Sequence, residues 1–329
     1  MRGFRDRMGS VSTLDSIEES ALPTTFTQSP VRRAQAACAA AALMLLAGCA
    51  SVSAPVVAET PGCLGDIAVN RMLADYNARR PAPNPPETMT MADARCTRSR
   101  LQQRLAGQDG RLAGYKAGLT STAAQQRFHT DQPVWGALYT SMLLGTGATV
   151  DAAFGARPLY EADLLVRVKS EAINHARTPA EVLDQVDQII GFIELPDLTV
   201  EAPARINGVG LTAINVGARL GVRGAPLQVP PDGAARGRLL DELRDMNVRL
   251  LDAQGAQLGG GKGADLLGHP LNAVVWLAGA LKAEGLSLRP GQLISLGSIS
   301  ALLPPKPGLQ VTAQYDGVTG LQPVTVTFR

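Results

Sequence analysis

The chain has 329 residues, of which 45% are hydrophobic and 18% charged, a composition that excludes a wholly disordered chain or a fibrous repeat. Its 31 Lys and Arg residues nearly balance its 29 Asp and Glu residues, and Phe, Trp and Tyr make up only 4% of it. Binding of nucleic acid needs a basic surface or aromatic side chains that stack on bases, so the composition argues against a nucleic-acid partner.

An uncharged, alanine-rich run extends over residues 34–48, directly after the pair Arg32-Arg33. A span across a bilayer needs about 20 apolar residues, so this run is too short for a transmembrane helix and suits the apolar part of a signal peptide. It leads into Leu46-Ala47-Gly48-Cys49-Ala50, which resembles a bacterial lipoprotein signal. The resemblance implies a lipid anchor at Cys49 on the periplasmic side of a bacterial membrane, and Ala50 favours the outer membrane. The alternative is a buried alanine-rich helix.

Three segments follow from this interpretation. Residues 1–48 are predicted to be a leader with the signal peptide, residues 49–62 a flexible tether rich in Ala, Ser, Val and Pro, and residues 63–329 a single domain. The domain retains two cysteines, Cys63 and Cys96, and in an oxidising compartment such an even pair predicts a disulfide. Two buried thiols are the alternative.

Two helices are predicted at the start of the domain. Apolar residues recur with helical spacing from residue 64 to residue 80, and a second helix is predicted from about residue 91 to residue 107. Four prolines lie between residues 81 and 86, and they exclude a regular element there. This segment is therefore predicted to link the two helices.

Beyond residue 110 the pattern changes to short strands and turns. A helix is predicted to begin at Thr178-Pro179, where the threonine can cap it, and another to run from His269 to Glu284, before Gly285. A hairpin turn is expected at residues 252–255. Strands are predicted over residues 159–168, 247–251, 292–296, 310–315 and 323–328.

The segment Gly259-Gly260-Gly261-Lys262-Gly263 is rich in glycine but lacks a Ser or Thr after the lysine. A phosphate-binding loop would need that hydroxyl, and it would also follow a strand in an alternating βα pattern. We therefore interpret the segment as a flexible loop at the edge of a site.

Three acidic residues are the strongest candidates for a functional site. Side chains alternate along a strand, so Glu161 and Asp163 point to the same side of the strand at 159–168, with their Cα atoms roughly 6.5 Å apart. Such a pair repels unless a cation lies between the carboxylates, whose oxygens favour a hard ion such as Mg²⁺ or Mn²⁺. A solvated strand face is the alternative. Glu194 follows the apolar run 189–193, and a shared metal ion would give this buried carboxylate a partner.

A series of motifs resembles the 2-keto-4-pentenoate hydratase and 4-oxalocrotonate decarboxylase family, part of the fumarylacetoacetate hydrolase superfamily. In chain order, the main matches are Gly114-Tyr115-Lys116-Ala117-Gly118-Leu119-Thr120-Ser121, Tyr160-Glu161-Ala162-Asp163, Glu194-Leu195-Pro196-Asp197, and residues 268–278. The resemblance extends over roughly residues 64–329. It implies an α+β fold, a mixed β-roll or barrel with N-terminal and peripheral helices, and a homo-oligomer.

The resemblance also implies a function. It assigns a bound Mg²⁺ or Mn²⁺ to Glu161, Asp163 and Glu194. The substrate would be a small 2-keto acid, and the enzyme a hydro-lyase that adds water to a 2-hydroxy-dienoic acid. The residues that would act on the substrate are Lys116, Ser298 and Asn215.

Three other functions stay open. One is the decarboxylation of an oxalocrotonate. Another is a non-catalytic periplasmic protein that keeps the fold to bind a ligand or a partner, because Gly210 and Ile214 stand where the family usually has acidic residues. Hydrolysis of a carbon–carbon bond ranks last, because no His–Glu pair lies near Lys116 in the sequence.

Overall fold

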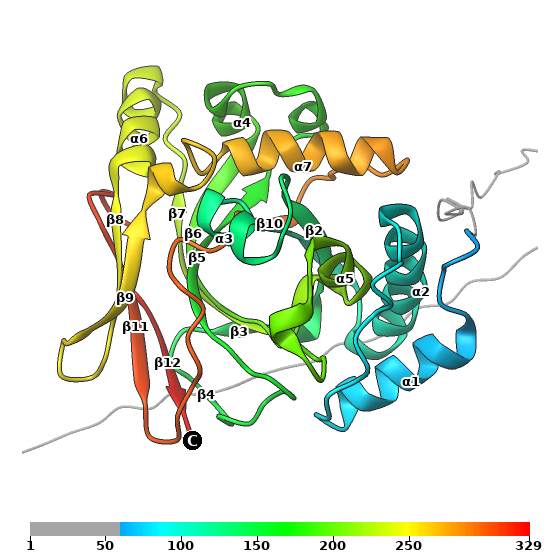
Figure 1. Cartoon of the computed structure of the whole chain (residues 1–329). Coiled ribbons are helices and arrows are strands. Elements are labelled where there is room, and N and C mark those ends of the chain that lie inside the picture. The colour runs from blue at the N-terminus through cyan, green and yellow to red at the C-terminus, as the bar shows by residue number, and fades with distance from the viewer. Residues whose placement is uncertain (1–59) are drawn as a thin grey trace, which may run out of the picture. The chain divides into compact units, whose positions relative to one another are not determined.

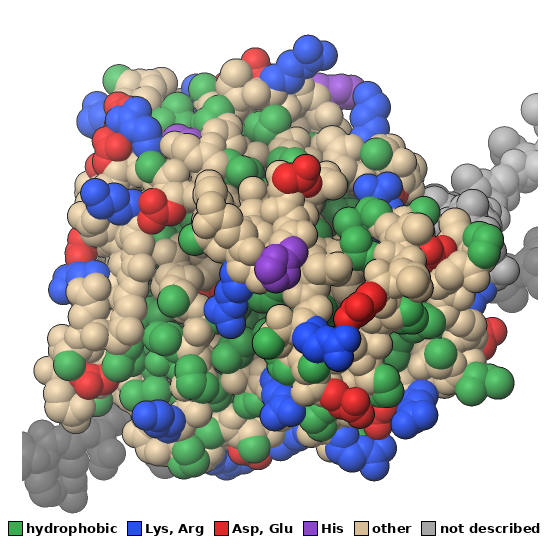
Figure 2. Space-filling model, viewed as in Figure 1, with side chains coloured by type: hydrophobic (Ala, Val, Ile, Leu, Met, Phe, Trp, Pro, Cys, Tyr) green, Lys and Arg blue, Asp and Glu red, His purple; other side chains and the backbone are tan. Residues whose placement is uncertain are grey.

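A computed structural model describes residues 60–329 of the chain. The predicted leader, the lipidation site Cys49 and the predicted tether up to residue 59 lie outside the described residues. Within residues 60–329, no helix is both long and apolar enough to cross a bilayer. The face of this part that Figure 2 shows carries acidic, basic and apolar side chains interspersed, so this face presents no extended basic surface.

Two mixed β-sheets form the centre of the fold, and the larger curls into a half-barrel (Figure 1). In order across the larger sheet, its strands are β2 (Val134–Tyr139), β1 (Leu112–Gly118), β10 (Leu293–Ser295), β5 (Glu161–Val168), β6 (Val186–Leu195), β7 (Leu220–Gln228) and β3 (Leu143–Gly145). In order across the smaller sheet, they are β4 (Ala148–Val150), β12 (Val324–Phe328), β11 (Gln310–Asp316), β8 (Asn247–Leu251) and β9 (Gln257–Lys262).

Seven α-helices of the described part surround the sheets (Figure 1). They are α1 (Asp66–Asn77), α2 (Met91–Asp109), α3 (Thr122–Arg127), α4 (Pro179–Asp184), α5 (Gly208–Ala213), α6 (Gly233–Asp245) and α7 (Asn272–Ala283). Short 3₁₀ helices occupy Thr140–Met142, Glu171–His175, Pro203–Arg205, Asn215–Gly217 and Gly263–Asp265. The arrangement agrees with the α+β architecture that the sequence motifs imply.

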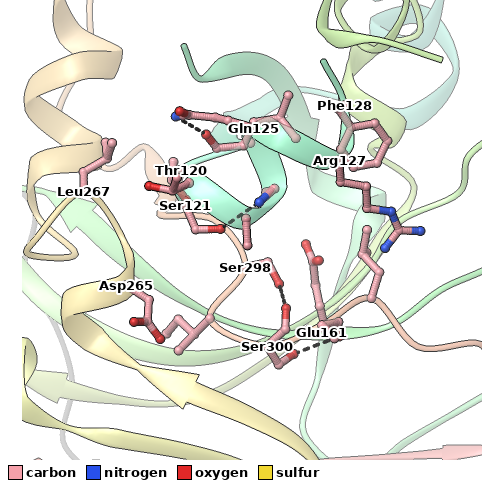
Figure 3. A pocket seen from close by; sticks show the side chains of 18 of the residues that line it. Thr120, Ser121, Gln125, Arg127, Phe128, Glu161, Asp265, Leu267, Ser298 and Ser300 are labelled. Atoms are coloured by element: carbon pink, nitrogen blue, oxygen red, sulfur yellow. Dashed lines mark hydrogen bonds between the residues drawn. The ribbon is translucent and has the colours of Figure 1, made fainter. Parts of the chain in front are cut away.

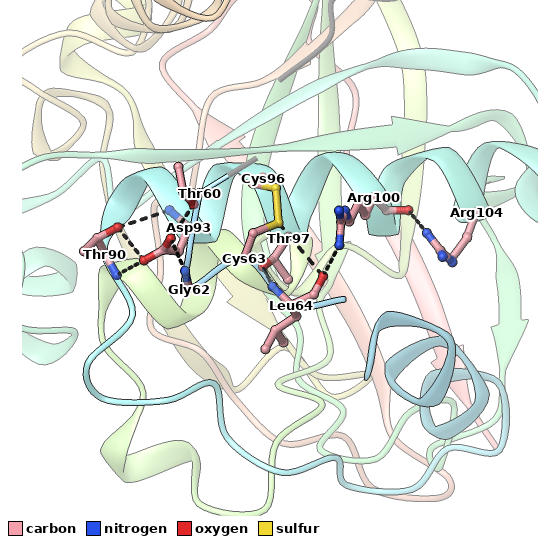
Figure 4. Close-up of a disulfide and its surroundings, with 10 residues drawn as sticks. All are labelled: Thr60, Gly62, Cys63, Leu64, Thr90, Asp93, Cys96, Thr97, Arg100 and Arg104. Carbon is pink, nitrogen blue, oxygen red and sulfur yellow. Dashed lines mark hydrogen bonds between the residues drawn. A yellow bond between two sulfur atoms is a disulfide. The ribbon is translucent and has the colours of Figure 1, made fainter. Parts of the chain in front are cut away.

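The start of the described chain is attached to α2 (Figure 4). A disulfide joins Cys63 to Cys96 of α2, with the two Cα atoms 5.7 Å apart. Asp93 accepts hydrogen bonds from the Thr60 hydroxyl and from the backbone N–H groups of Gly62 and Thr90. These hydrogen bonds, that of Thr60 first, together with one from the Thr90 hydroxyl, lower the pKa of Asp93 to about 2. The last residues of the predicted tether are therefore fixed to the domain.

The glycine-rich segment at 259–263 is not a flexible loop, and this prediction is wrong. Residues 257–262 form strand β9, which pairs with β8 in register from Asn247 opposite Lys262. A Cβ atom on Gly260 would lie 2.3 Å from the Val248 carbonyl oxygen, and one on Gly261 would lie 1.9 Å from that of Ile299. The glycines are thus required by close packing of backbone against backbone.

Further differences concern helices. The sequence patterns did not predict α3, α5 or α6. Helix α6 begins at the N-cap Asp232 and buries only Leu239 and Leu243. Helix α7 begins at Asn272, three residues after the predicted start at His269. The His269 ring instead accepts a hydrogen bond from the Leu271 N–H at 3.0 Å and contacts the Leu240 carbonyl at 3.1 Å, so it fixes the turn that precedes the helix.

We expect the disulfide to stabilise the fold by restricting the unfolded chain. It closes a loop with a sequence separation of 33 residues, for which loop-closure entropy gives roughly 3–4 kcal/mol. Reduction should therefore lower the free energy of unfolding, measured by denaturant titration, by about that amount. The Cys63→Ser/Cys96→Ser variant should show the lower stability without added reductant, and reductant should not change it. Equal stability of the oxidised and reduced proteins would contradict this role.

Candidate active site

The three candidate carboxylates meet on one face of the larger sheet. Glu161 and Asp163 lie on β5, and Glu194 on the adjacent antiparallel strand β6, directly opposite Glu161. Residues that oppose one another in an antiparallel pair point to the same face. All three are buried, with exposed fractions of 6%, 0% and 1% respectively. The alternative of a solvated strand face is therefore excluded.

Lys116 is the only cation in contact with this carboxylate cluster among the described residues. It lies on β1, is 3% exposed, and its ammonium group donates hydrogen bonds to Glu194 Oε1 and, at 3.0 Å, to the Val216 carbonyl oxygen. Its position two strands away from β5 in the sheet follows from the parallel pairing of β1 with β10 and the antiparallel pairing of β10 with β5. The curl of the sheet brings this side chain to Glu194.

The carboxylates differ in how fully their oxygens are bonded. Asp163 accepts hydrogen bonds from the Ser295 hydroxyl and from the backbone N–H groups of Leu164 and Leu296. Glu194 Oε1 is bound to Lys116, whereas Glu194 Oε2 is buried without a hydrogen-bond partner in residues 60–329. A buried oxygen of this kind costs free energy unless a cation or a donor reaches it.

Electrostatics within the cluster favour a bound cation. Burial raises the pKa of both Glu161 and Asp163 well above the usual range, and the nearby charge of Glu194 raises it further. With every group ionised, three carboxylates and one ammonium carry −3 + 1 = −2 charges. As the side chains stand, no three His, Cys, Asp or Glu groups within residues 60–329 are close enough together to hold an ion. The cluster fits a divalent cation in charge and in its oxygen ligands, but not in the spacing of its side chains as they stand.

A cavity of about 790 Å³ lies beside the cluster (Figure 3). Lys116, Glu161 and Ser298 line it, whereas Asp163 and Glu194 do not. Part of the wall is apolar and belongs to a separate buried cluster, with Leu119, Phe128, Leu198, Leu211 and Val216 facing the cavity. The cavity thus combines charged and polar side chains with an apolar wall, as small-molecule sites commonly do.

Ser298 and Asn215, two residues that the sequence motifs place at the substrate, have different surroundings. Ser298 faces the cavity, and its hydroxyl donates to the Ser300 carbonyl oxygen. Asn215 does not line the cavity, because its amide oxygen accepts from the Ala137 N–H at 2.8 Å and its amide NH₂ donates to the Ala137 carbonyl at 3.0 Å. Asn215 thus holds the turn whose next residue, Val216, bonds Lys116, and its contact with a substrate stays a prediction.

Several residues that line the cavity were not predicted as site residues. Thr120 and Ser121 lie inside a motif that the sequence displays, and the Thr120 hydroxyl is buried without a partner in the described part. Arg127 and Asp265 also line the cavity. These two lie on α3 and on the 3₁₀ helix after β9, and no periodic pattern in the sequence connects them to β5.

Proteins similar to this chain are hydratases and decarboxylases. The 2-keto-4-pentenoate hydratase of Paraburkholderia xenovorans (strain LB400) is 31% identical over 232 residues, 70% of this chain and 82% of that enzyme. The 4-oxalocrotonate decarboxylase of Pseudomonas putida is 27% identical over 234 residues, 70% of this chain and 83% of that enzyme. The structure of 4-oxalocrotonate decarboxylase from Pseudomonas putida G7, complexed with magnesium and adipate, matches with a TM-score of 0.69 and 25% identity over 80% of this chain and 96% of that one. No family model matches the chain.

Removal of the ammonium group should expose the repulsion among the carboxylates. In the metal-free protein we expect Lys116→Met to lower the free energy of unfolding at neutral pH by about 3–5 kcal/mol, because Glu194 loses its buried partner. The pKa values of Glu161 and Asp163 are raised by folding, so their ionisation destabilises the fold as the pH rises. The decrease in the free energy of unfolding that Lys116→Met causes should therefore be smaller at acidic pH. Denaturant titration at several pH values tests this, and Lys116→Met/Glu194→Gln should be less destabilised than Lys116→Met.

Proposed function

The chain belongs to the family of 2-keto-4-pentenoate hydratases and 4-oxalocrotonate decarboxylases, and from this premise we propose that it is a divalent-metal-dependent lyase of the hydratase type that acts on a small 2-keto acid. The observation that carries the proposal is the buried cluster of Glu161, Asp163 and Glu194 with Lys116, of which Glu161 and Lys116 line the cavity. The match extends over 82% of the length of the related hydratase.

Glu161, Asp163 and Glu194 would hold the metal ion. Carboxylate oxygens suit Mg²⁺ or Mn²⁺, and the Glu194 Oε2 atom, which has no hydrogen-bond partner in the described residues, supports this assignment. The similar decarboxylase structure contains magnesium. When bound, such an ion supplies Lewis acidity toward the oxygen atoms of the substrate.

The side chains of the cavity would bind and orient the keto acid. The Lys116 ammonium group is held by Glu194 and the Val216 carbonyl, so it presents a fixed positive charge to an anionic substrate and can hold or release a proton. The Ser298 hydroxyl faces the same space. The apolar wall that includes Leu119 and Leu198 excludes water from the carbon chain.

Decarboxylation of an oxalocrotonate is the second candidate. It is favoured by the similarity to the decarboxylase structure, which covers 80% of this chain. Both reactions begin with the same class of 2-keto acid, and they differ in whether water is added or carbon dioxide is lost. The product therefore distinguishes them.

We also propose a cellular location for the enzyme. The pattern from Arg32-Arg33 to Cys49 supports a lipid anchor on the periplasmic side of a bacterial membrane, with Ala50 favouring the outer membrane. The disulfide between Cys63 and Cys96 supports an oxidising compartment. A homo-oligomer is proposed from the family resemblance alone.

Turnover of 2-hydroxypenta-2,4-dienoate in the presence of Mg²⁺ tests the proposed function. We expect water to be added across the 4,5 double bond, and Glu161→Gln to lose bound metal and at least about 100-fold in kcat/KM because a metal ligand is removed. The exposed residue Glu201 provides a matched control, since Glu201→Gln should retain activity. Metal content by elemental analysis that is equal in wild type and Glu161→Gln would refute the metal assignment.

Metal binding should depend on pH. Because burial and Glu194 raise the pKa of Glu161 and Asp163, the metal-free site retains protons that an incoming ion must displace. The affinity for Mg²⁺ should fall as the pH falls, by up to about tenfold per pH unit for each proton displaced. Calorimetry in buffers of different ionisation enthalpy counts these protons. An affinity that stays constant from about pH 6 to pH 8, without proton release, would show that the carboxylates are already ionised.

A further inference from the structure

Gln102 joins helix α2 to the turn that supplies the second hydrogen-bond acceptor of Lys116. Helix α2 lies beside α5 and β2 (Figure 1). Gln102 is half-buried and does not line the cavity, and its side-chain NH₂ donates a hydrogen bond of 2.8 Å to the Asn215 amide oxygen. The contact links the second helix of the domain to a turn 113 residues later in the chain.

The backbone of Ala137 fixes which end of the Asn215 amide faces Gln102. The amide oxygen accepts from the Ala137 N–H at 2.8 Å, and the amide NH₂ donates to the Ala137 carbonyl at 3.0 Å. An amide turned by half a rotation would place donor against donor and acceptor against acceptor. The oxygen therefore stays toward Gln102, so the residue at position 102 has to present a donor.

Helix α2 is fixed to strand β2 at two points. The Arg98 guanidinium group donates to the Trp135 carbonyl at 3.2 Å, and the Tyr139 hydroxyl donates to the Gln102 carbonyl at 2.8 Å. The disulfide through Cys96 holds an earlier turn of the same helix. The Gln102 side chain thus extends from a helix that cannot easily move relative to β2.

The turn beyond Asn215 needs such support. Asn215 and Val216 both have left-handed φ angles, of 54° and 53°, which non-glycine residues keep only where their surroundings hold them. The turn also packs closely on β1, since a Cβ atom on Gly118 would lie 2.7 Å from Val216 Cγ1. If the turn relaxed, the Val216 carbonyl would leave its place 3.0 Å from the Lys116 ammonium group.

We propose that Gln102 is a positioning residue for Lys116. It acts through two other residues, because its donor fixes the Asn215 amide and the Asn215 turn places the Val216 carbonyl against the ammonium group. Strand β2 completes the arrangement, since its residue Ala137 pairs with Tyr115, the neighbour of Lys116 on β1. The inference rests on the proposed function, because Lys116 is the residue that would act on the substrate.

Three substitutions of Gln102 separate hydrogen bonding from packing. Met fills a similar volume without a donor, Glu turns an acceptor toward the Asn215 oxygen, and Lys retains a donor. With Mg²⁺ and 2-hydroxypenta-2,4-dienoate, we expect kcat/KM to fall about fivefold or more in Gln102→Met, as for one lost hydrogen bond, and further in Gln102→Glu. Gln102→Lys should retain most of the activity. A side chain that only fills space would instead make Gln102→Met the most active of the three variants.

Hydrogen exchange of the full chain with Mg²⁺, followed by NMR, tests the turn without turnover. The Ala137 N–H donates to Asn215, so its exchange rate reports how firmly the turn is held. We expect faster exchange in Gln102→Met and Gln102→Glu, and a rate close to that of the wild type in Gln102→Lys. Gln103→Met is the matched control, because Gln103 is the next residue of α2, is exposed and does not line the cavity. Its activity and exchange rates should equal those of the wild type.

The two measurements distinguish the role of Gln102 from the proposed function. A wild-type exchange rate of the Ala137 N–H in Gln102→Met, or an activity of Gln102→Lys no higher than that of Gln102→Met, overturns the role of Gln102 and leaves the proposed function standing. If the wild type turns over no 2-keto acid, the proposed function fails, and the exchange rates alone decide whether Gln102 holds the turn.

Discussion

The buried ion pair between Lys116 and Glu194 is the contact on which the arrangement of the site depends. Three carboxylates buried on one face of a sheet repel one another, and desolvation adds to the cost. The Lys116 ammonium group reduces that cost, but only if it is held next to Glu194. The Val216 carbonyl oxygen holds it there by accepting a second hydrogen bond from it, at 3.0 Å.

The turn that supplies this carbonyl has an unusual backbone. Asn215, Val216 and Gly217 all adopt left-handed φ angles, of 54°, 53° and 64°, and for a β-branched residue such as Val216 this conformation costs of order 1–3 kcal/mol. The paired hydrogen bonds between the Asn215 amide and the backbone of Ala137 on β2 hold the turn in place. Gly136 allows the approach, since a Cβ atom there would lie 2.5 Å from the Asn215 carbonyl oxygen. The strain is therefore maintained by contacts that place Lys116.

Strand alternation was enough to predict that Glu161 and Asp163 share a face, because that relation depends only on residues two apart. The family resemblance added Lys116 and Ser298, which lie on other strands and loops. The resemblance also gave Asn215, but the sequence does not reveal that its amide is bonded to the backbone of Ala137. Arg127 was missed because it lines the cavity from α3, a helix that no periodic pattern in the sequence connects to β5.

The smaller sheet also contributes to the site, through one tyrosine. The Tyr315 hydroxyl of β11 donates toward the carbonyls of Asp163 and Phe192, and accepts from the Phe192 N–H at 2.8 Å. It reaches β5 and β6 beside Gly191, where a Cβ atom would lie 2.7 Å from the tyrosine ring. The hydroxyl thus satisfies backbone groups where the pairing of β6 with β7 becomes irregular, between Ile190 and Phe192. One of these backbone groups belongs to Asp163 itself, and the others belong to Phe192, two residues before Glu194. The smaller sheet therefore fixes the position of two carboxylates, Asp163 and Glu194, that it does not contact directly.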